Sequence, residues 1–121
     1  MKILVVDDDD GNRRLASRML MRNPVYAVQE ADGGLTCLAM AQREHFDAVL
    51  LDISMPDMDG IEVCRRLRKM PDYATTCIIA CTAHAGTRDR DDFLQQGFSS
   101  VLTKPFLLEE LFAVLPAPMD N

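Results

Sequence analysis

Residues 47–53 read DAVLLDI, a run of four consecutive apolar residues between two aspartates, followed by Ile53. A short and wholly apolar run is typical of a central strand of a parallel sheet, which is buried on both faces. Such a sheet needs helices on both sides, so this stretch predicts an α/β protein. Asp52 then stands at the carboxyl end of the most deeply buried strand.

Strand-like and helix-like segments alternate along the whole chain. The expected strands are residues 2–6, 25–30, 47–53, 76–83 and 100–104, and the expected helices are residues 12–22, 33–44, 61–70, 88–96 and 107–115. Leu35, Leu38 and Ala39 are expected to form the buried face of the second helix. Five β–α units with right-handed connections predict an open, doubly wound parallel sheet.

The composition suits one globular domain. The chain has 121 residues, of which 48% are hydrophobic and 26% charged, and its net charge is −6. This negative charge argues against direct binding to nucleic acid or to an anionic membrane, and no apolar run approaches the roughly 20 residues of a membrane span.

The four cysteines form no C-x-x-C pair, so we expect reduced, buried thiols and a cytoplasmic protein. Residues 1–121 are expected to form one domain, with 116–121 as a tail or linker.

Charged and polar side chains stand at the carboxyl ends of four expected strands. The first strand ends in the run Asp7–Asp10, the third at Asp52, the fourth at Thr82 and the fifth at Lys104. In open α/β sheets these ends border a common crevice, so the side chains should converge there. Neither helix nor strand propensity explains this set, which indicates a functional site.

The residue types at these ends suggest their chemistry. Clustered carboxylates without histidine or cysteine suit a hard divalent cation, Mg²⁺ in the first place and Mn²⁺ as a substitute. A lysine beside that cation can pair with a phosphoryl oxygen, and a threonine hydroxyl can donate to another. An aspartate carboxylate can be the nucleophile that forms an aspartyl phosphate. Asp52, in the middle of the sheet, is the candidate.

The strings ILVVDDD, LLDISMPDMDG, CTA and LTKPF, in this order, resemble the receiver domain of two-component response regulators. The resemblance covers essentially the whole chain. It implies a (βα)5 flavodoxin-like fold with strand order 2-1-3-4-5, and a signalling phosphoacceptor rather than an enzyme. The phosphoryl donor that it implies is a phosphohistidine of a histidine kinase or histidine phosphotransfer protein. MPDMDG and CTAHA are especially similar to receivers of hybrid kinases and phosphorelays, although stand-alone regulators carry such strings too.

The resemblance also implies a metal site. Asp52 is the phosphoacceptor and one of the carboxylates that hold Mg²⁺. Asp8 ligates the ion directly, Asp7 does so mainly through water, and the backbone carbonyl of Ser54 is the third protein ligand.

Further roles follow from the same resemblance. Thr82 senses the phosphoryl group and Lys104 pairs with it, with the Lys104–Pro105 bond in the cis form. Ser54 and His84 lie two residues beyond the acceptor and the threonine, and we expect them to set the lifetime of the phosphoryl group. The surface around residues 88–96, 100–104 and 107–115 is the expected output surface for a downstream partner that the sequence does not name.

Val101 departs from the family pattern. The position three before the lysine often carries tyrosine or phenylalanine, whose ring turns inward on activation. Val101 cannot operate such a rotamer switch, so output must use another change or be weak.

The remaining aspartates of the opening run are expected at the start of the first helix. Asp9 and Asp10 should face outward, where negative charge suits the helix dipole, and one of the two should be the N-terminal cap, with Asp10 favoured over Asp9. Asp59 should cap the helix over residues 61–70, and Gly60 should be a turn residue.

The aspartates and glycines of this sequence also suggest three other functions. A haloacid-dehalogenase-type phosphatase needs a threonine or valine after D-x-D, and Asp8–Asp10 is followed by Gly11 and Asn12. A calcium loop centred on Gly11 or Gly60 lacks ligands at its first and twelfth positions. A degenerate receiver that acts only as a protein-binding module is the alternative that stays open.

Overall fold

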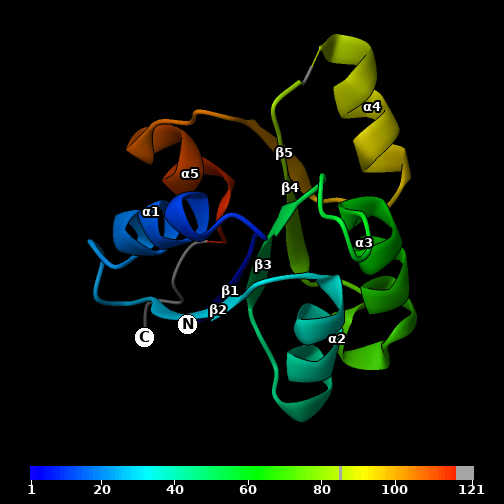
Figure 1. Cartoon of the computed structure of the whole chain (residues 1–121), viewed down its shortest axis with the longest axis horizontal. Helices are drawn as coiled ribbons and strands as arrows, with labels where there is room; N and C mark the ends of the chain where they lie inside the picture. The colour runs from blue at the N-terminus through cyan, green and yellow to red at the C-terminus, as the bar shows by residue number, and fades with distance from the viewer. Residues whose placement is uncertain (85, 117–121) are drawn as a thin grey trace.

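The computed structural model describes residues 1–84 and 86–116, and it contains the five expected β–α units (Figure 1). The strands are β1 (Lys2–Val6), β2 (Ala27–Ala31), β3 (Ala48–Asp52), β4 (Cys77–Thr82) and β5 (Ser100–Thr103). The helices are α1 (Asp10–Leu20), α2 (Gly34–Arg43), α3 (Gly60–Lys69), α4 (Thr87–Gln95) and α5 (Leu108–Val114), with a short 3-10 helix η1 (Pro71–Tyr73) that the sequence analysis did not predict. Most boundaries differ from the expected ones by one or two residues.

The five strands form a single parallel sheet in the order β2-β1-β3-β4-β5, which confirms the predicted flavodoxin-like topology. All residues of β3 are buried, as its apolar sequence predicted. The chain order reverses between β1 and β3, where Val6 pairs with Leu51. The residues that follow these two strands therefore meet at the switch point of the sheet, where open α/β proteins bind ligands.

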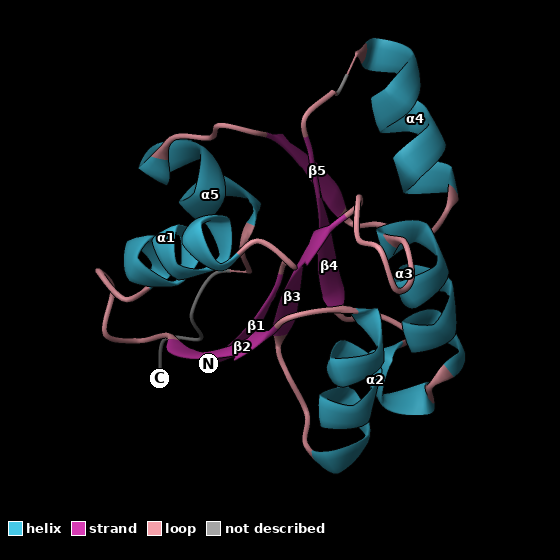
Figure 2. Ribbon diagram, in the orientation of Figure 1, coloured by secondary structure: helices cyan, strands magenta, loops and turns pink. Residues whose placement is uncertain are grey.

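Helices cover both faces of the sheet (Figure 2): α1 and α5 lie on one face, and α2, α3 and α4 on the other. Side chains along β3 alternate between the two resulting cores. Leu50 packs with the α1 and α5 side, whereas Val49 and Leu51 pack with the opposite side. This alternation is why an apolar run without polar gaps is needed at the centre of the sheet.

The expected buried face of α2 was wrong for two of its three residues. Leu35 and Ala39 are exposed, and the helix instead buries Gly34, Cys37 and Ala41. The reason is the close approach of α2 to α3, since a Cβ atom on Gly34 would lie 2.7 Å from Cγ2 of Val63. A helix that packs this closely presents its small residues to its neighbour and leaves larger ones outside.

The caps of α1 and α3 test two further expectations. Asp59 caps α3 as predicted, because its carboxylate accepts a hydrogen bond of 2.9 Å from the backbone N–H of Glu62. Of the two aspartates expected as the cap of α1, Asp9 is the cap and the favoured Asp10 is not; Asp9 accepts from the N–H of Asn12 at 2.8 Å. The backbone of Asp9 is extended, as a cap requires, whereas Asp10 is already the first helical residue.

Two other expectations concern the ends of the chain and membranes. Residues 117–121, most of the expected tail, lie outside the described residues, and the division into one domain with a tail stays a prediction. Within the described ranges, no helix combines the length and the apolar character that crossing a membrane would take.

Gly60 brings α3 directly onto the end of β3, and its substitution tests that contact. A Cβ atom at residue 60 would lie 2.5 Å from the backbone oxygen of Asp52. Gly60→Ala should therefore lower the free energy of unfolding by about 1–3 kcal/mol, measured by chemical denaturation. Gly86→Ala is the matched control, because its Cβ would meet Asp89 at an ordinary 3.6 Å, and it should cost less than about 1 kcal/mol. Equal effects of the two substitutions would contradict the close approach of α3.

Candidate functional site

Three carboxylates gather at the carboxyl edge of the sheet. Asp7 and Asp8 follow β1, and Asp52 ends the neighbouring strand β3. One carboxylate oxygen from each of the three lies within 4.8 Å of the others. Asp7 and Asp52 are each only 6% exposed, whereas Asp8 is exposed. The sequence predicted this convergence. Two of these carboxylates are buried beside a third, and burying like charges together is costly unless a positive group pairs with them.

Lys104, which follows β5, reaches into this cluster. Its Nζ atom donates to Oδ2 of Asp7 at 3.1 Å and to Oδ1 of Asp52 at 3.0 Å. Its backbone N–H donates to the carbonyl of Thr82, and the Lys104–Pro105 peptide bond is cis, as the resemblance predicted. One ammonium group thus bridges the ends of two strands that carry like charges.

The pKa values of these groups reflect burial and their mutual contacts. Burial is the largest influence on Asp52 and raises its pKa, the charge of Asp7 raises it further, and the hydrogen bond from Lys104 opposes both. Burial alone would lower the pKa of Lys104, but its contacts with Asp52 and Asp7 outweigh this and raise it. Lys104 is therefore a permanent cation at neutral pH, and it balances only part of the negative charge.

Arg13 fixes the loop that carries the acidic pair, a role that the sequence analysis missed. Its Nη1 atom donates to the backbone carbonyl of Asp7 at 3.0 Å, its Nε atom donates to Glu30 at 2.9 Å, and Nη2 pairs with Asp10. The N–H of Asp9 adds a hydrogen bond of 2.9 Å to Oδ1 of Asp7. The spacing of Asp10 and Arg13 in a helix signals their ion pair, but no local pattern signals the contact with Asp7.

The side chains of the other predicted residues border the cluster, and within the described part of the chain none of them makes a hydrogen bond to the Lys104 ammonium group. The N–H of Ser54 donates to Oδ1 of Asp52 at 3.4 Å, which places Ser54 beside the acceptor. The hydroxyl of Thr82 donates to the carbonyl of His84 at 3.0 Å and accepts from its N–H at 3.2 Å. Ser54 and His84 are both exposed at the rim. Thr82 therefore uses its hydrogen on its own loop, and it must turn away from His84 to donate elsewhere.

Val101 lies in the core on the face covered by α2, α3 and α4, and is 6% exposed. Its carbonyl accepts a hydrogen bond of 3.4 Å from Nη1 of Arg90, which ties α4 to β5. This small aliphatic side chain offers no ring that could turn between an outer and an inner orientation.

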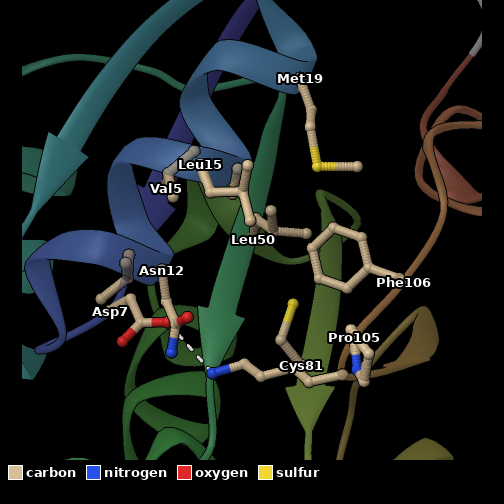
Figure 3. Close-up of a pocket in the computed structure, with 12 residues that line it drawn as sticks. Val5, Asp7, Asn12, Leu15, Met19, Leu50, Cys81, Pro105 and Phe106 are labelled. Carbon is tan, nitrogen blue, oxygen red and sulfur yellow. Dashed lines mark hydrogen bonds and ion pairs between the residues drawn. The ribbon is translucent and has the colours of Figure 1, made fainter.

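A cavity of about 300 Å³ adjoins the acidic cluster between α1 and the segment after β5 (Figure 3). Asp7 lies at its polar end, its lining includes Lys104, which contacts Asp7, and its apolar wall includes Leu15, Met19 and Phe106. Leu15 is 60% exposed at its mouth. The surface on this side of the cluster is therefore apolar and accessible, in contrast to the side of the exposed Asp8 carboxylate.

The open parallel sheet of order 2-1-3-4-5, with an acidic cluster and a lysine at its carboxyl edge, defines the class of flavodoxin-like α/β domains with a charged site at the switch point. Comparison with family models assigns the chain within this class. It belongs to the response regulator receiver domain family, whose model matches residues 3–116.

Individual relatives agree with this assignment. Response regulator MprA of Mycobacterium leprae is 42% identical over 117 residues, which cover 97% of this chain and 50% of MprA. The chain thus spans half the length of that relative. Chemotaxis response regulator CheY4 of Vibrio cholerae has a similar structure, with a TM-score of 0.86 and 32% identity over 94% of this chain and 98% of that one.

A further solved structure is the receiver domain of the sensor histidine kinase PA1611 from Pseudomonas aeruginosa PAO1, with a magnesium ion coordinated in its active-site cleft. Its TM-score is 0.83 and its identity 33%, over 93% of this chain and 92% of that one. Receivers of response regulators and of kinases are therefore both similar to this chain.

The raised pKa of Asp52 leads to a prediction about stability and pH. Because the folded protein binds the Asp52 proton more tightly than the unfolded chain, ionised Asp52 lowers stability once the pH exceeds its folded pKa. In metal-free protein, Asp52→Asn should therefore melt at a higher temperature than wild type at about pH 7, and the gap should narrow towards about pH 4. Melting curves in EDTA measure this. If the difference in melting temperature does not change with pH, or if the variant is less stable than wild type at neutral pH, the charge of Asp52 is not what lowers the stability.

Proposed function

We propose that this domain is a phosphoacceptor that takes a phosphoryl group from a phosphohistidine onto Asp52. The donor is a histidine kinase or a histidine phosphotransfer protein, and the reaction requires Mg²⁺. The observation that carries the proposal is the meeting of Asp52 with two further carboxylates and with the Lys104 ammonium group at the switch point of the sheet. Placement in this family supports it.

The donor set fits a magnesium ion. Asp7, Asp8 and Asp52 offer hard carboxylate oxygens within 4.8 Å of each other. Asp8 and Asp52 would bind the ion directly and Asp7 mainly through water, and we assign the backbone carbonyl of Ser54 as the third direct protein ligand. Mn²⁺ would suit the same ligands. When bound, the ion would neutralise charge between the carboxylates and the incoming phosphoryl oxygens. The magnesium ion in the PA1611 receiver supports this assignment.

Each residue of the site has its own part in the proposed phosphoryl transfer. A carboxylate oxygen of Asp52 attacks phosphorus, the bond from phosphorus to the donor's imidazole nitrogen breaks, and the imidazole leaves with the electron pair of that bond. Lys104 exchanges one of its carboxylate contacts for a phosphoryl oxygen, which it neutralises. Thr82 turns its hydroxyl from the carbonyl of His84 to another phosphoryl oxygen. Ser54 and His84 flank the approach of water and set the lifetime of the product.

The surroundings of the site suit a protein donor and a protein target. The exposed apolar side chains of Leu15 and Leu107, together with the exposed carboxylate of Asp8, supply a contact surface for the donor. We assign the surface of α4, β5 and α5 to the downstream partner, with no direct contact to nucleic acid or membrane. The domain acts as a signalling component that assists its own phosphorylation and dephosphorylation, and not as an enzyme with a separate substrate. Its free thiols suit the reducing cytoplasm, where we place it.

The alternative of a degenerate receiver is not supported. A binding module without phosphotransfer has no need of buried like charges that are held together by one lysine. The acidic cluster, Lys104 and Thr82 are all retained at the expected strand ends.

The proposed function is tested with a small phosphodonor. Incubation with acetyl phosphate and Mg²⁺ should add the mass of one phosphoryl group, measured by intact-protein mass spectrometry. Asp52→Ala should abolish the addition while the protein stays folded by circular dichroism. A folded wild-type protein that gains no mass, or a variant that gains it unchanged, would overturn the proposal.

The metal site is tested by a pair of aspartates from the same run. Mg²⁺ at about one hundred times its Kd should stabilise the wild-type protein by about 2.7 kcal/mol. Asp8→Ala should abolish this gain, because it removes a direct ligand. Asp10→Ala removes the same charge two residues away, where the side chain pairs with Arg13, and should keep nearly the full gain. Denaturation with and without Mg²⁺ measures both, and equal losses would refute the assignment of Asp8.

A further inference from the structure

The N-terminus of α2 has no cap of its own. The residue at its cap position is Gly33, which offers no side-chain acceptor, and the first turn contains no acidic residue. The first backbone N–H groups of a helix have no partner within the helix, and a side-chain oxygen from the cap residue normally satisfies one of them. The acceptor for α2 must come from elsewhere.

Asp57 supplies that acceptor from the loop between β3 and α3. Its Oδ1 atom accepts from the N–H of Gly34 at 3.3 Å, and its Oδ2 atom accepts from the N–H of Leu35 at 3.1 Å. The hydrogen bond from Leu35 is the main cause of the lowered pKa of Asp57. A Cβ atom at Gly33 would lie 2.9 Å from Oδ2 of Asp57, so the glycine leaves the space that the carboxylate occupies. Gly33 and Asp57 form one matched contact.

The same loop borders the phosphoacceptor. The N–H of Ser54 donates to the Asp52 carboxylate, and the N–H of Gly60 donates to the carbonyl of Ile53 at 2.9 Å. Between Ser54 and Asp57 stand only Met55, which is buried, and Pro56, whose ring fixes its own φ and restricts the residue before it. A displacement of Asp57 is therefore passed to Ser54 through a short and stiff segment.

We propose that Asp57 is a positioning residue for the phosphoacceptor site. By capping α2 from a distance, it holds the loop of residues 53–59 against that helix, and so fixes the backbone of Ser54 beside Asp52. Neither Asp57 nor Gly33 contacts the acidic cluster through a hydrogen bond found in the described part of the chain. The effect on metal binding rests on the proposed function, whereas the tether itself does not.

The experiment must separate a tether from an ordinary helix cap. Asp57→Ala removes both the tether and the cap. Adding Gly33→Asp restores a local cap, because Gly33 has an extended backbone that any residue adopts, and the three atoms nearest to the new Cβ all belong to the Asp57 side chain that is now absent. Asp32→Asn is the charge control: it removes a negative charge from the loop before α2, where the Asp32 carboxylate accepts a hydrogen bond of 3.0 Å from the hydroxyl of Thr36.

Hydrogen exchange in metal-free protein tests the tether directly. Asp57→Ala should speed exchange both in the first turn of α2 and in residues 53–56. The double variant should regain protection in α2 and not in residues 53–56, and Asp32→Asn should resemble wild type. Loop protection that is unchanged by Asp57→Ala, or that returns with the local cap, overturns the proposal whether or not the domain accepts phosphate.

Isothermal titration with Mg²⁺ tests the consequence for the site. Asp57→Ala should raise the Kd for Mg²⁺ by about tenfold, the lower end of the cost of losing a group that supports a metal ligand. The double variant should regain its melting temperature but not its affinity. If wild type binds no Mg²⁺, the proposed function fails; if wild type binds and all variants bind equally well, only the positioning role fails.

Discussion

The contact of one lysine with two buried carboxylates is the interaction on which this site depends. Asp7 follows β1 and Asp52 ends the neighbouring strand β3, and their carboxylates would repel each other at the distance that the sheet imposes. Lys104 lies between them and is held there by the chain that leaves β5. The balance is incomplete, since Asp8 adds a third charge. A site with this excess of negative charge favours a divalent cation.

The fold holds these like charges together because it fixes the backbone around each of the carboxylates. Parallel strands bring their carboxyl ends to one edge, and the reversal of order between β1 and β3 leaves that edge open to ligands. Gly60 allows α3 to pack directly onto the backbone of Asp52. Arg13 holds the carbonyl of Asp7 from the opposite side. The carboxylates therefore cannot relieve their repulsion by moving apart.

The order of the strands and helices could be predicted from the sequence, because each element carries its own periodic pattern. The convergence of polar side chains at the strand ends could also be predicted, because the topology of open α/β sheets brings these ends together. The sequence was insufficient wherever the outcome depends on contacts between distant segments. The buried face of α2 follows from the closeness of α3, which the exposed Leu35 could not reveal. The cap of α1 shifted from Asp10 to Asp9 because two adjacent aspartates satisfy the same rule. Asp57 carries no signal in its neighbourhood; only the missing side chain at Gly33 hints that a cap must come from elsewhere.

The tether between Asp57 and α2 also bears on how this receiver can transmit a signal without an aromatic ring at residue 101. Coupling between two places is reciprocal: an event at Asp52 that moves Ser54 must change the strength of the α2 cap by the same free energy by which the cap influences that event. A helix cap of this kind is worth about 1 kcal/mol, and less where it is exposed, which corresponds to a change of a few fold in an equilibrium. That amount is modest, and it suffices to bias the order of the N-terminus of α2, where Leu35 is 59% exposed. The loop after β3 thus connects the site with α2 through contacts that need no aromatic side chain at residue 101.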